Sequence, residues 1–201
     1  HPGSFMPLRS VALTYSSPER PIAYFEPTFD QGFLGLGNQS VPRSVAVPLS
    51  GDFAADPRKL LAAAPDAGVY YLCNPNNPTG VVVPQNEVRQ LLDGIPEDMP
   101  VLIDEAYHHF VEDPRYATAI PYVKEGRRVV IARTFSKIYG MAALRIGYAV
   151  APADMIQEMR NYSTGSVNVL ARWGAAAALD DPNAETRVLN ITTRLRNATS
   201  T

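Results

Sequence analysis

Three short apolar segments, spaced about 30 residues apart, are the feature that most constrains how this chain folds. They cover residues 69–72, 101–103 and 129–131 and consist mainly of β-forming side chains. Each interval leaves room for one crossover helix, which is the spacing of parallel strands. Similar patterns predict further strands near 22–25, 44–48 and 146–150, and helices near 5–15, 57–64, 84–93, 152–160, 167–179 and 184–197. We therefore predict an α/β fold with a mostly parallel sheet and helices on both faces, in three layers.

Polar residues follow each of the three apolar segments. The first runs into NPNNPTG, which holds Asn74, Asn76 and Asn77, the second into Asp104 and Glu105, and the third into TFSKIYG, which holds Lys137. In an open parallel sheet the carboxyl ends of the strands share one edge, and ligands bind there. We therefore expect Asn77, Asp104 and Lys137 to converge. Each also has a plainer reading, because Asn and Pro build turns, a carboxylate after a strand is often a cap, and most lysines are solvated.

The segment TFSKIYGMAALRIGY places Lys137 between hydroxyl residues and eight positions before Arg145. A lysine at the end of a buried strand loses hydration, which favours the neutral amine that can attack a carbonyl carbon. Thr134, Ser136 and Arg145 are suited to hold an anion nearby. An amine, the Asp104 carboxylate, the Tyr107 phenol and an anion cradle are together the parts that a pyridoxal 5'-phosphate site requires.

The motifs NPNNPTG, IDEAYHHF and RTFSKIYGMAALRIGY resemble the three signatures of the class I/II, fold type I, pyridoxal-phosphate aminotransferases. The resemblance is nearest to the histidinol-phosphate aminotransferase branch and runs from about Gly3 to the end of the chain. It implies that Lys137 forms the Schiff base with the cofactor and moves the substrate proton. It also implies that Asp104 pairs with the protonated pyridine nitrogen, and that Asn77 and Tyr107 hydrogen-bond the phenolate oxygen.

The same resemblance implies that Thr134, Ser136 and Arg145 bind the cofactor phosphate. Phe29, in EPTFD, matches the aromatic residue that stacks on the pyridine ring, although core packing is an alternative for any aromatic side chain. Ser4 matches a glycine-rich turn that opens a helix toward the phosphate. The next residues are Phe5, Met6 and Pro7, where the branch commonly has an acidic residue.

The resemblance implies that residues 1–201 form the cofactor-binding large domain, without the N-terminal arm and the small C-terminal domain of the family. The expected activity is transfer of an amino group between an amino acid, or an amino-alcohol phosphate such as histidinol phosphate, and a 2-oxo acid. A homodimer is expected, with sites near the subunit interface. The alternatives are a decarboxylase or lyase on the same fold, and a regulator domain that senses pyridoxal phosphate.

Charge and composition exclude several other classes. The net charge of −2 gives no reason to expect nucleic acid or an anionic membrane as a partner. Neither a membrane span nor a signal peptide is apparent, and the single cysteine, Cys73, is compatible with a cytoplasmic protein. We expect Cys73 in the core and no metal site. His108 and His109 are expected at the surface or in a subunit contact.

Overall fold

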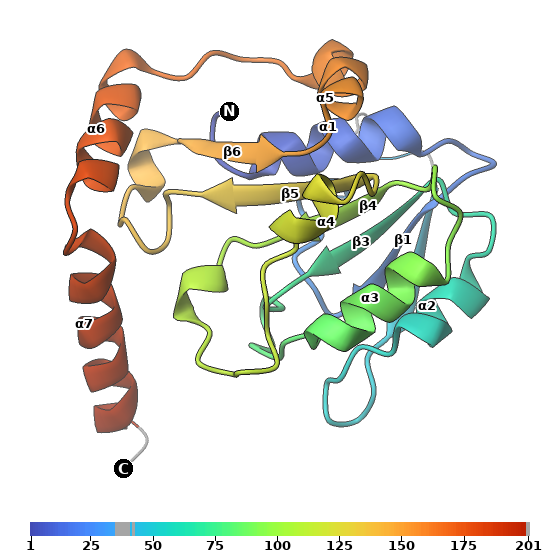
Figure 1. Ribbon diagram of the computed structural model, residues 1–201, viewed down its shortest axis with the longest axis horizontal. Coiled ribbons are helices and arrows are strands. Elements are labelled where there is room, and N and C mark those ends of the chain that lie inside the picture. Colours follow the sequence, from blue (N-terminus) through green and yellow to red (C-terminus); the bar gives the residue numbers. More distant parts are fainter. Residues whose placement is uncertain (35–40, 42, 200–201) are drawn as a thin grey trace.

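The computed structural model describes residues 1–34, 41 and 43–199. One six-stranded sheet, in the order β2-β1-β3-β4-β5-β6, organises the molecule (Figure 1). Strands β1 to β5 run parallel, and β6 pairs antiparallel with β5. The strands are β1 (Ile22–Glu26), β2 (Ser44–Pro48), β3 (Val69–Cys73), β4 (Val101–Asp104), β5 (Val129–Thr134) and β6 (Gly147–Val150).

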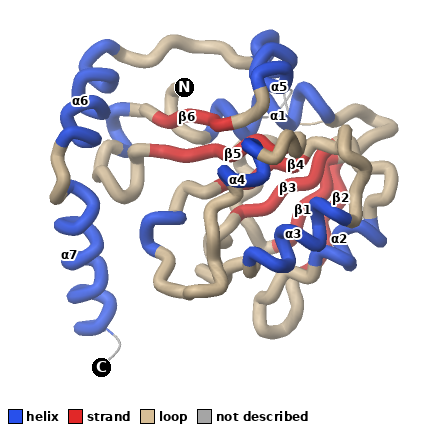
Figure 2. The backbone as a smooth tube through the Cα atoms, viewed as in Figure 1, coloured by secondary structure: helices blue, strands red, loops and turns tan. Residues whose placement is uncertain are grey.

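Helices cover both faces of this sheet, which confirms the predicted three-layer α/β fold (Figure 2). The main helices are α1 (Phe5–Tyr15), α2 (Pro57–Ala63), α3 (Gln85–Asp93), α4 (Ile120–Lys124), α5 (Ala153–Glu158), α6 (Val169–Asp180) and α7 (Ala184–Thr199). Short 3₁₀ segments are η2 (His108–Phe110), η3 (Ala142–Leu144) and η4 (Met159–Tyr162). The predicted elements all occur within a few residues of their expected bounds. The short helix α4 and the 3₁₀ turns were not predicted.

Alternate strand residues separate two hydrophobic cores, as the period of two in a β-strand requires. On one face Leu60 of α2, and Leu91 of α3, pack with Ile103 of β4. On the other face Leu8 of α1 packs with Leu102 of β4. Because both faces are buried, β3 and β4 read as continuous apolar runs in the sequence.

The last two helices leave this layered body. Figure 1 shows α6 and α7 running in succession along one side of the molecule, beyond the loops at the end of β5. The loop after β5 packs on α6, where Phe135 and Ile146 form a small cluster with Ala171 and Ala175. The loop that carries Lys137 is therefore covered from outside by the C-terminal helices.

Candidate active site

A cavity of about 180 Å³ lies where the carboxyl ends of β3, β4 and β5 meet. The nine residues predicted for the site all line it: Ser4, Phe29, Asn77, Asp104, Tyr107, Thr134, Ser136, Lys137 and Arg145. They come from six separate stretches of the chain. Register explains the convergence, because Cys73 of β3 pairs with Asp104 of β4, and Asp104 pairs with Ala132 of β5.

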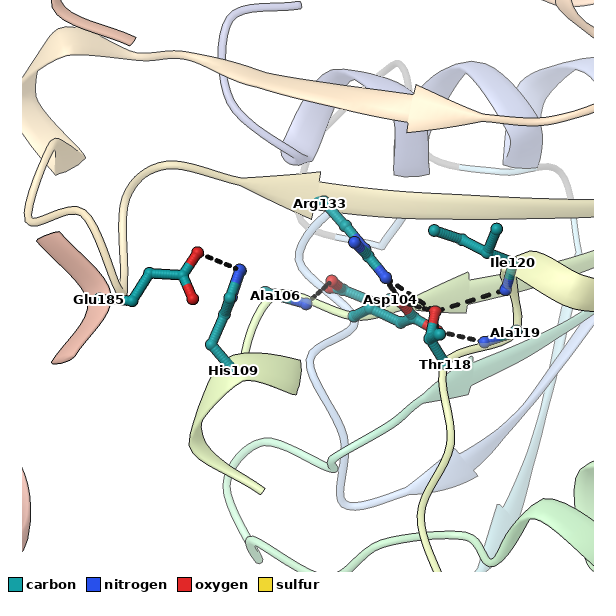
Figure 3. A network of polar contacts seen from close by, with 9 residues as sticks. Asp104, Ala106, His109, Thr118, Ala119, Ile120, Arg133 and Glu185 are labelled. Atoms are coloured by element: carbon teal, nitrogen blue, oxygen red, sulfur yellow. Dashed lines mark hydrogen bonds and ion pairs between the residues drawn. The ribbon is translucent and has the colours of Figure 1, made fainter. Parts of the chain in front are cut away.

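Asp104 is the buried carboxylate of this cavity. It ends β4 and is 2% exposed. Its Oδ1 accepts a hydrogen bond from the Ala106 N–H at 3.0 Å (Figure 3). Burial raises the pKa of Asp104 to about 7, and nearby Glu105 adds to the rise, whereas the Ala106 N–H and the charge of Lys137 oppose it. A buried carboxylate with this pKa favours a cationic partner, which would hold it in the ionised form.

Lys137 follows β5 in a turn and reaches the same cavity. Its Nζ lies 4.9 Å from the centroid of the Tyr107 ring, a cation–π contact. Lys137 is exposed to solvent, so the expected loss of hydration is wrong. The reason is local: β5 ends at Thr134, and Phe135 takes the buried position, so the chain has left the sheet before Lys137.

Hydroxyl and guanidinium groups form the anion-binding part of the cavity. Thr134 Oγ1 donates to Ser136 Oγ at 2.9 Å and accepts from the Ser136 N–H at 3.1 Å. Arg145 Nη1 lies 3.5 Å from Ser136 Oγ and donates to the Ala142 carbonyl at 2.8 Å. Across the described ranges, no ion pair joins Arg145 to a carboxylate. The guanidinium charge is therefore available to an anionic ligand.

The N-terminal segment closes this part of the cavity by a close backbone approach. A Cβ on Gly3 would come within 2.5 Å of Arg145 Nη2, and a Cβ on Gly147 would come within 2.8 Å of the Ser4 nitrogen. Gly3 also has a φ of +79°, a backbone angle that residues other than glycine rarely adopt. The two glycines thus allow Ser4, at the start of α1, to reach the cavity. Ser4 makes no side-chain capping bond, so its hydroxyl can serve a ligand.

The antiparallel course of β6 brings Arg145 to this edge. Thr134, at the end of β5, pairs with Gly147, at the start of β6. Arg145 itself has φ 52° and ψ 59°, in the left-handed region, at the end of η3. Such strain in a non-glycine residue often accompanies a functional site.

The three asparagines after β3 have different positions. Asn74 is 2% exposed and exchanges hydrogen bonds with the backbone of Val83. The Asn76 side chain accepts a hydrogen bond from the Thr28 hydroxyl and donates one to the Thr79 hydroxyl. Only Asn77 lines the cavity. The Asn74–Pro75 and Asn77–Pro78 peptide bonds are both cis.

The cavity also contains residues that sequence reasoning did not assign to it: Phe5, Cys73, Ala106 and Ala142. Cys73 is buried, as expected, and burial raises the pKa of its thiol to about 12. The thiol is therefore protonated. Its position at the last residue of β3 was the signal that could have placed it at this edge.

A buried ion pair stands directly behind Asp104. Glu105 is 1% exposed and accepts hydrogen bonds from the Ala119 N–H at 2.7 Å and the Thr118 hydroxyl at 2.9 Å. Arg133 donates to the same carboxylate through Nε at 3.0 Å and Nη2 at 2.7 Å. Figure 3 shows Arg133, Thr118 and Ala119 gathered at this point. The network joins β4, β5 and the start of α4.

His108 and His109 were expected at the surface or in a subunit contact, and the structure places both in partly buried positions. The subunit contact stays a prediction. The two imidazole rings lie 3.6 Å apart, and the His109 side chain is 14% exposed. Burial lowers the pKa of His108 to about 3, with His109 and Arg133 contributing. His109 Nε2 lies 3.5 Å from Glu185 Oε1 of α7 (Figure 3). Packing of the C-terminal helix against η2 explains the burial.

In the described part of the chain, His, Cys, Asp and Glu side chains nowhere form a group of three or more that could hold a metal ion. Among the helices of that part of the chain, none combines the length and the apolar character that crossing a bilayer requires.

Comparison with protein families gives a match over residues 3–199 to the model described as "Aminotransferase class I and II". A histidinol-phosphate aminotransferase of Moorella thermoacetica is 38% identical over 177 residues, which is 87% of this chain and 45% of that protein. One of Symbiobacterium thermophilum is 39% identical, over 89% of this chain and 49% of that protein. The chain thus spans about half the length of these relatives.

Solved structures show the same similarity. A putative histidinol-phosphate aminotransferase from Erwinia carotovora atroseptica has a TM-score of 0.85 and 31% identity, over 94% of this chain and 56% of that one. L-threonine-O-3-phosphate decarboxylase from Porphyromonas gingivalis has a TM-score of 0.76 and 26% identity, over 96% and 56%.

Proposed function

This chain belongs to the class I and II aminotransferase family, and on that premise we propose that residues 1–201 form the cofactor-binding large domain of a pyridoxal-phosphate aminotransferase. The proposed reaction moves an amino group between an amino acid, or an amino-alcohol phosphate such as histidinol phosphate, and a 2-oxo acid. The similarity to histidinol-phosphate aminotransferases supports the second kind of donor.

One observation carries the proposal: a single cavity holds a lysine amine, a buried carboxylate and a guanidinium without a carboxylate partner among the described residues. These groups are complementary to a planar ring that has a carbonyl carbon, a cationic nitrogen and a phosphate. Because Gly3 and Gly147 have no side chains, the backbone of residues 3–4 lies close to Arg145 and β6. The residues present therefore fit pyridoxal phosphate, the cofactor of this family.

When bound, pyridoxal phosphate supplies the electron sink that makes the substrate α-hydrogen acidic. We assign the chemistry of the protein to three residues. Lys137 holds the cofactor through its amine and then carries the proton removed from the substrate α-carbon. Asp104 pairs with the ring nitrogen and keeps it protonated, and Tyr107 donates a hydrogen bond to the phenolic oxygen.

The other cavity residues bind and orient the cofactor. Asn77 donates to the phenolic oxygen from the turn after β3. Arg145 and the hydroxyls of Ser4, Thr134 and Ser136 bind the phosphate, where the planar guanidinium suits a bidentate contact. Phe29 stacks on the ring, and its backbone is fixed because the Tyr71 hydroxyl donates to the Phe29 carbonyl at 2.8 Å.

The sequence makes the lysine assignment directly testable, because its lysines are Lys59, Lys124 and Lys137. The protein is mixed with pyridoxal phosphate, reduced with borohydride, digested and analysed by mass spectrometry. We expect the cofactor on the peptide that contains Lys137. Before reduction, we expect a visible absorbance band that Lys137→Ala abolishes. Lys124→Ala is the matched control and keeps the band. A band that survives in Lys137→Ala refutes the assignment.

A decarboxylase is the second candidate, favoured by the similarity to L-threonine-O-3-phosphate decarboxylase. The two reactions differ in which bond at the α-carbon is broken. Amino donors, histidinol phosphate among them, are added one at a time to the loaded protein. Transamination gives an oxo product and the aminated cofactor, whereas decarboxylation releases carbon dioxide from an amino acid and returns the original absorbance band.

We also propose that the protein acts as a homodimer in the cytoplasm. The exposed apolar face of α6, which includes Leu170 at 74% and Trp173 at 73% exposure, supports association of two copies. The single cysteine of the sequence supports a reducing compartment.

A further inference from the structure

The carboxylate of Glu185, on α7, lies between the two loops that hold Lys137 and Tyr107. It accepts a short hydrogen bond from the Tyr139 hydroxyl, two residues after Lys137. The same oxygen, Oε1, lies 3.5 Å from Nε2 of His109, two residues after Tyr107. Figure 3 shows Glu185 facing His109 from the C-terminal helix. One side chain of α7 therefore contacts both loops.

The rings behind these two loops also contact one another. The His109 ring meets the Tyr139 ring edge to face, with centroids 5.8 Å apart. The Phe135 and Tyr139 rings are 4.9 Å apart. In the cavity, the Lys137 Nζ lies over the Tyr107 ring. Ring contacts therefore join the Lys137 loop to the Tyr107 loop at the same place where Glu185 contacts both.

We propose that Glu185 is a positioning residue for the reactive amine, because it ties the Lys137 loop to the Tyr107 loop through Tyr139 and His109. This inference rests on the proposed function, in which Lys137 is the residue that takes the cofactor. Glu185 does not line the cavity and touches neither group directly. Its effect on Lys137 is exerted through the two loops.

The protonation states of the cluster agree with this role. Burial and the hydrogen bond to Glu185 raise the pKa of Tyr139, so its hydroxyl stays a donor. Burial lowers the pKa of His109, which keeps the ring neutral near pH 7, although Glu185 opposes the shift. His109 Nδ1 is buried and has no hydrogen-bond partner in the described structure. The single ring proton of a neutral His109 is therefore best placed on Nε2, where it faces Glu185.

A second contact of α7 supplies the matched control. Arg196 Nη2 lies 3.3 Å from Glu112 Oε1, farther along the helix and away from the Lys137 loop. Arg196→Ala removes this tie of α7 and leaves the Glu185 contacts in place. Glu185→Gln keeps an acceptor for Tyr139, whereas Glu185→Ala keeps none.

Hydrogen–deuterium exchange of the protein without added cofactor tests the coupling of the two loops. In Glu185→Ala we expect exchange to accelerate about tenfold, in peptides spanning 135–141 and 107–110 together, as expected when a tie of about 1.4 kcal/mol is lost. Arg196→Ala leaves both peptides unchanged, and Glu185→Gln stays close to the unmodified protein. Acceleration in only one of the two peptides, or equal acceleration in Arg196→Ala, overturns the proposal.

A chemical readout then separates positioning from simple stabilisation. The rate at which pyridoxal phosphate attaches to Lys137, trapped with borohydride, is expected to fall about tenfold in Glu185→Ala and to recover in Glu185→Gln. In a double-mutant cycle, Tyr139→Phe and Glu185→Ala are expected to be non-additive. Unchanged attachment in Glu185→Ala refutes the positioning role. Attachment at a residue other than Lys137 in the unmodified protein refutes the proposed function instead, while the exchange result stands.

Discussion

Asp104 shows how burial of a single carboxylate ties stability to pH. The side chain is 2% exposed, and burial raises the pKa of Asp104 to about 7 from an ordinary value near 3.8. Between these two values the folded chain holds a proton that the unfolded chain has released. The free energy of unfolding therefore falls as the pH rises from about 4 to about 7, and levels off above that.

We expect Asp104→Asn to remove this pH dependence. In denaturant unfolding of the protein without cofactor, the variant should gain stability relative to the unmodified protein between pH 5 and pH 8. The gain is a few kcal/mol at most, from about 1.4 kcal/mol per pKa unit. Asp93→Asn, at an exposed ion pair with Arg127, is the control and should not change the slope. Parallel slopes for Asp104→Asn and the unmodified protein would contradict the assignment.

At the level of residues, the motifs predicted which side chains share the cavity, but not their environments. Polar residues directly after apolar strands indicate the right edge of the sheet, which is why Asn77, Asp104 and Lys137 line the cavity. Ser4 and Phe29 were assigned only through the family resemblance, and they line it too. The exposure of Lys137 depends on where β5 ends, and the burial of His109 depends on α7. Neither is encoded in the few residues around the motif.

At the level of elements, most strands were predictable because β1, β3, β4 and β5 are parallel and almost wholly buried, which gives apolar runs in the sequence. The direction of β6 was not predictable, because the residues of a strand do not encode whether it pairs parallel or antiparallel. Helix α4 has five residues and contains Pro121, so no helical periodicity could develop. The connection that carries α4 is held instead by Glu105, through Thr118 and Ala119.

We predict that Glu105→Gln destabilises the fold by up to about 3–5 kcal/mol, because it leaves the largely buried charge of Arg133 without a carboxylate partner. Urea unfolding followed by circular dichroism measures the change. Glu125→Gln is the matched control: Glu125 also accepts two hydrogen bonds from one arginine, Arg89, but at the surface. Glu125→Gln should lower the free energy of unfolding only slightly. Equal costs for the two variants would show that burial of the Glu105 network adds nothing.

At the level of the whole molecule, apolar side chains are concentrated on the outer helices. Val169, Leu170, Trp173 and Leu179 of α6 are each more than 60% exposed. A large patch of this kind on a folded protein marks an interaction surface. Aromatic residues such as tryptophan contribute most to such interfaces.

We predict that Trp173→Glu weakens self-association, with a dimer dissociation constant at least about 30-fold higher than in the unmodified protein. Sedimentation equilibrium over a range of concentrations measures it. Phe53→Glu replaces another exposed aromatic side chain, in the turn after β2, and should leave association unchanged. A monomeric unmodified protein, or association that persists in Trp173→Glu, would contradict the homodimer.

The meeting of Gly3 with Gly147 has a consequence for how the protein matures. Gly3 lies just before α1 and Gly147 begins β6, so the pocket beside Arg145 cannot form until β6 has been synthesised and has docked. Contacts between residues so far apart in the sequence form slowly. A ligand that binds only the completed pocket draws the population toward the folded state. With pyridoxal phosphate as the proposed ligand, a larger supply of vitamin B6 during synthesis should increase the share of newly made protein that survives proteolysis.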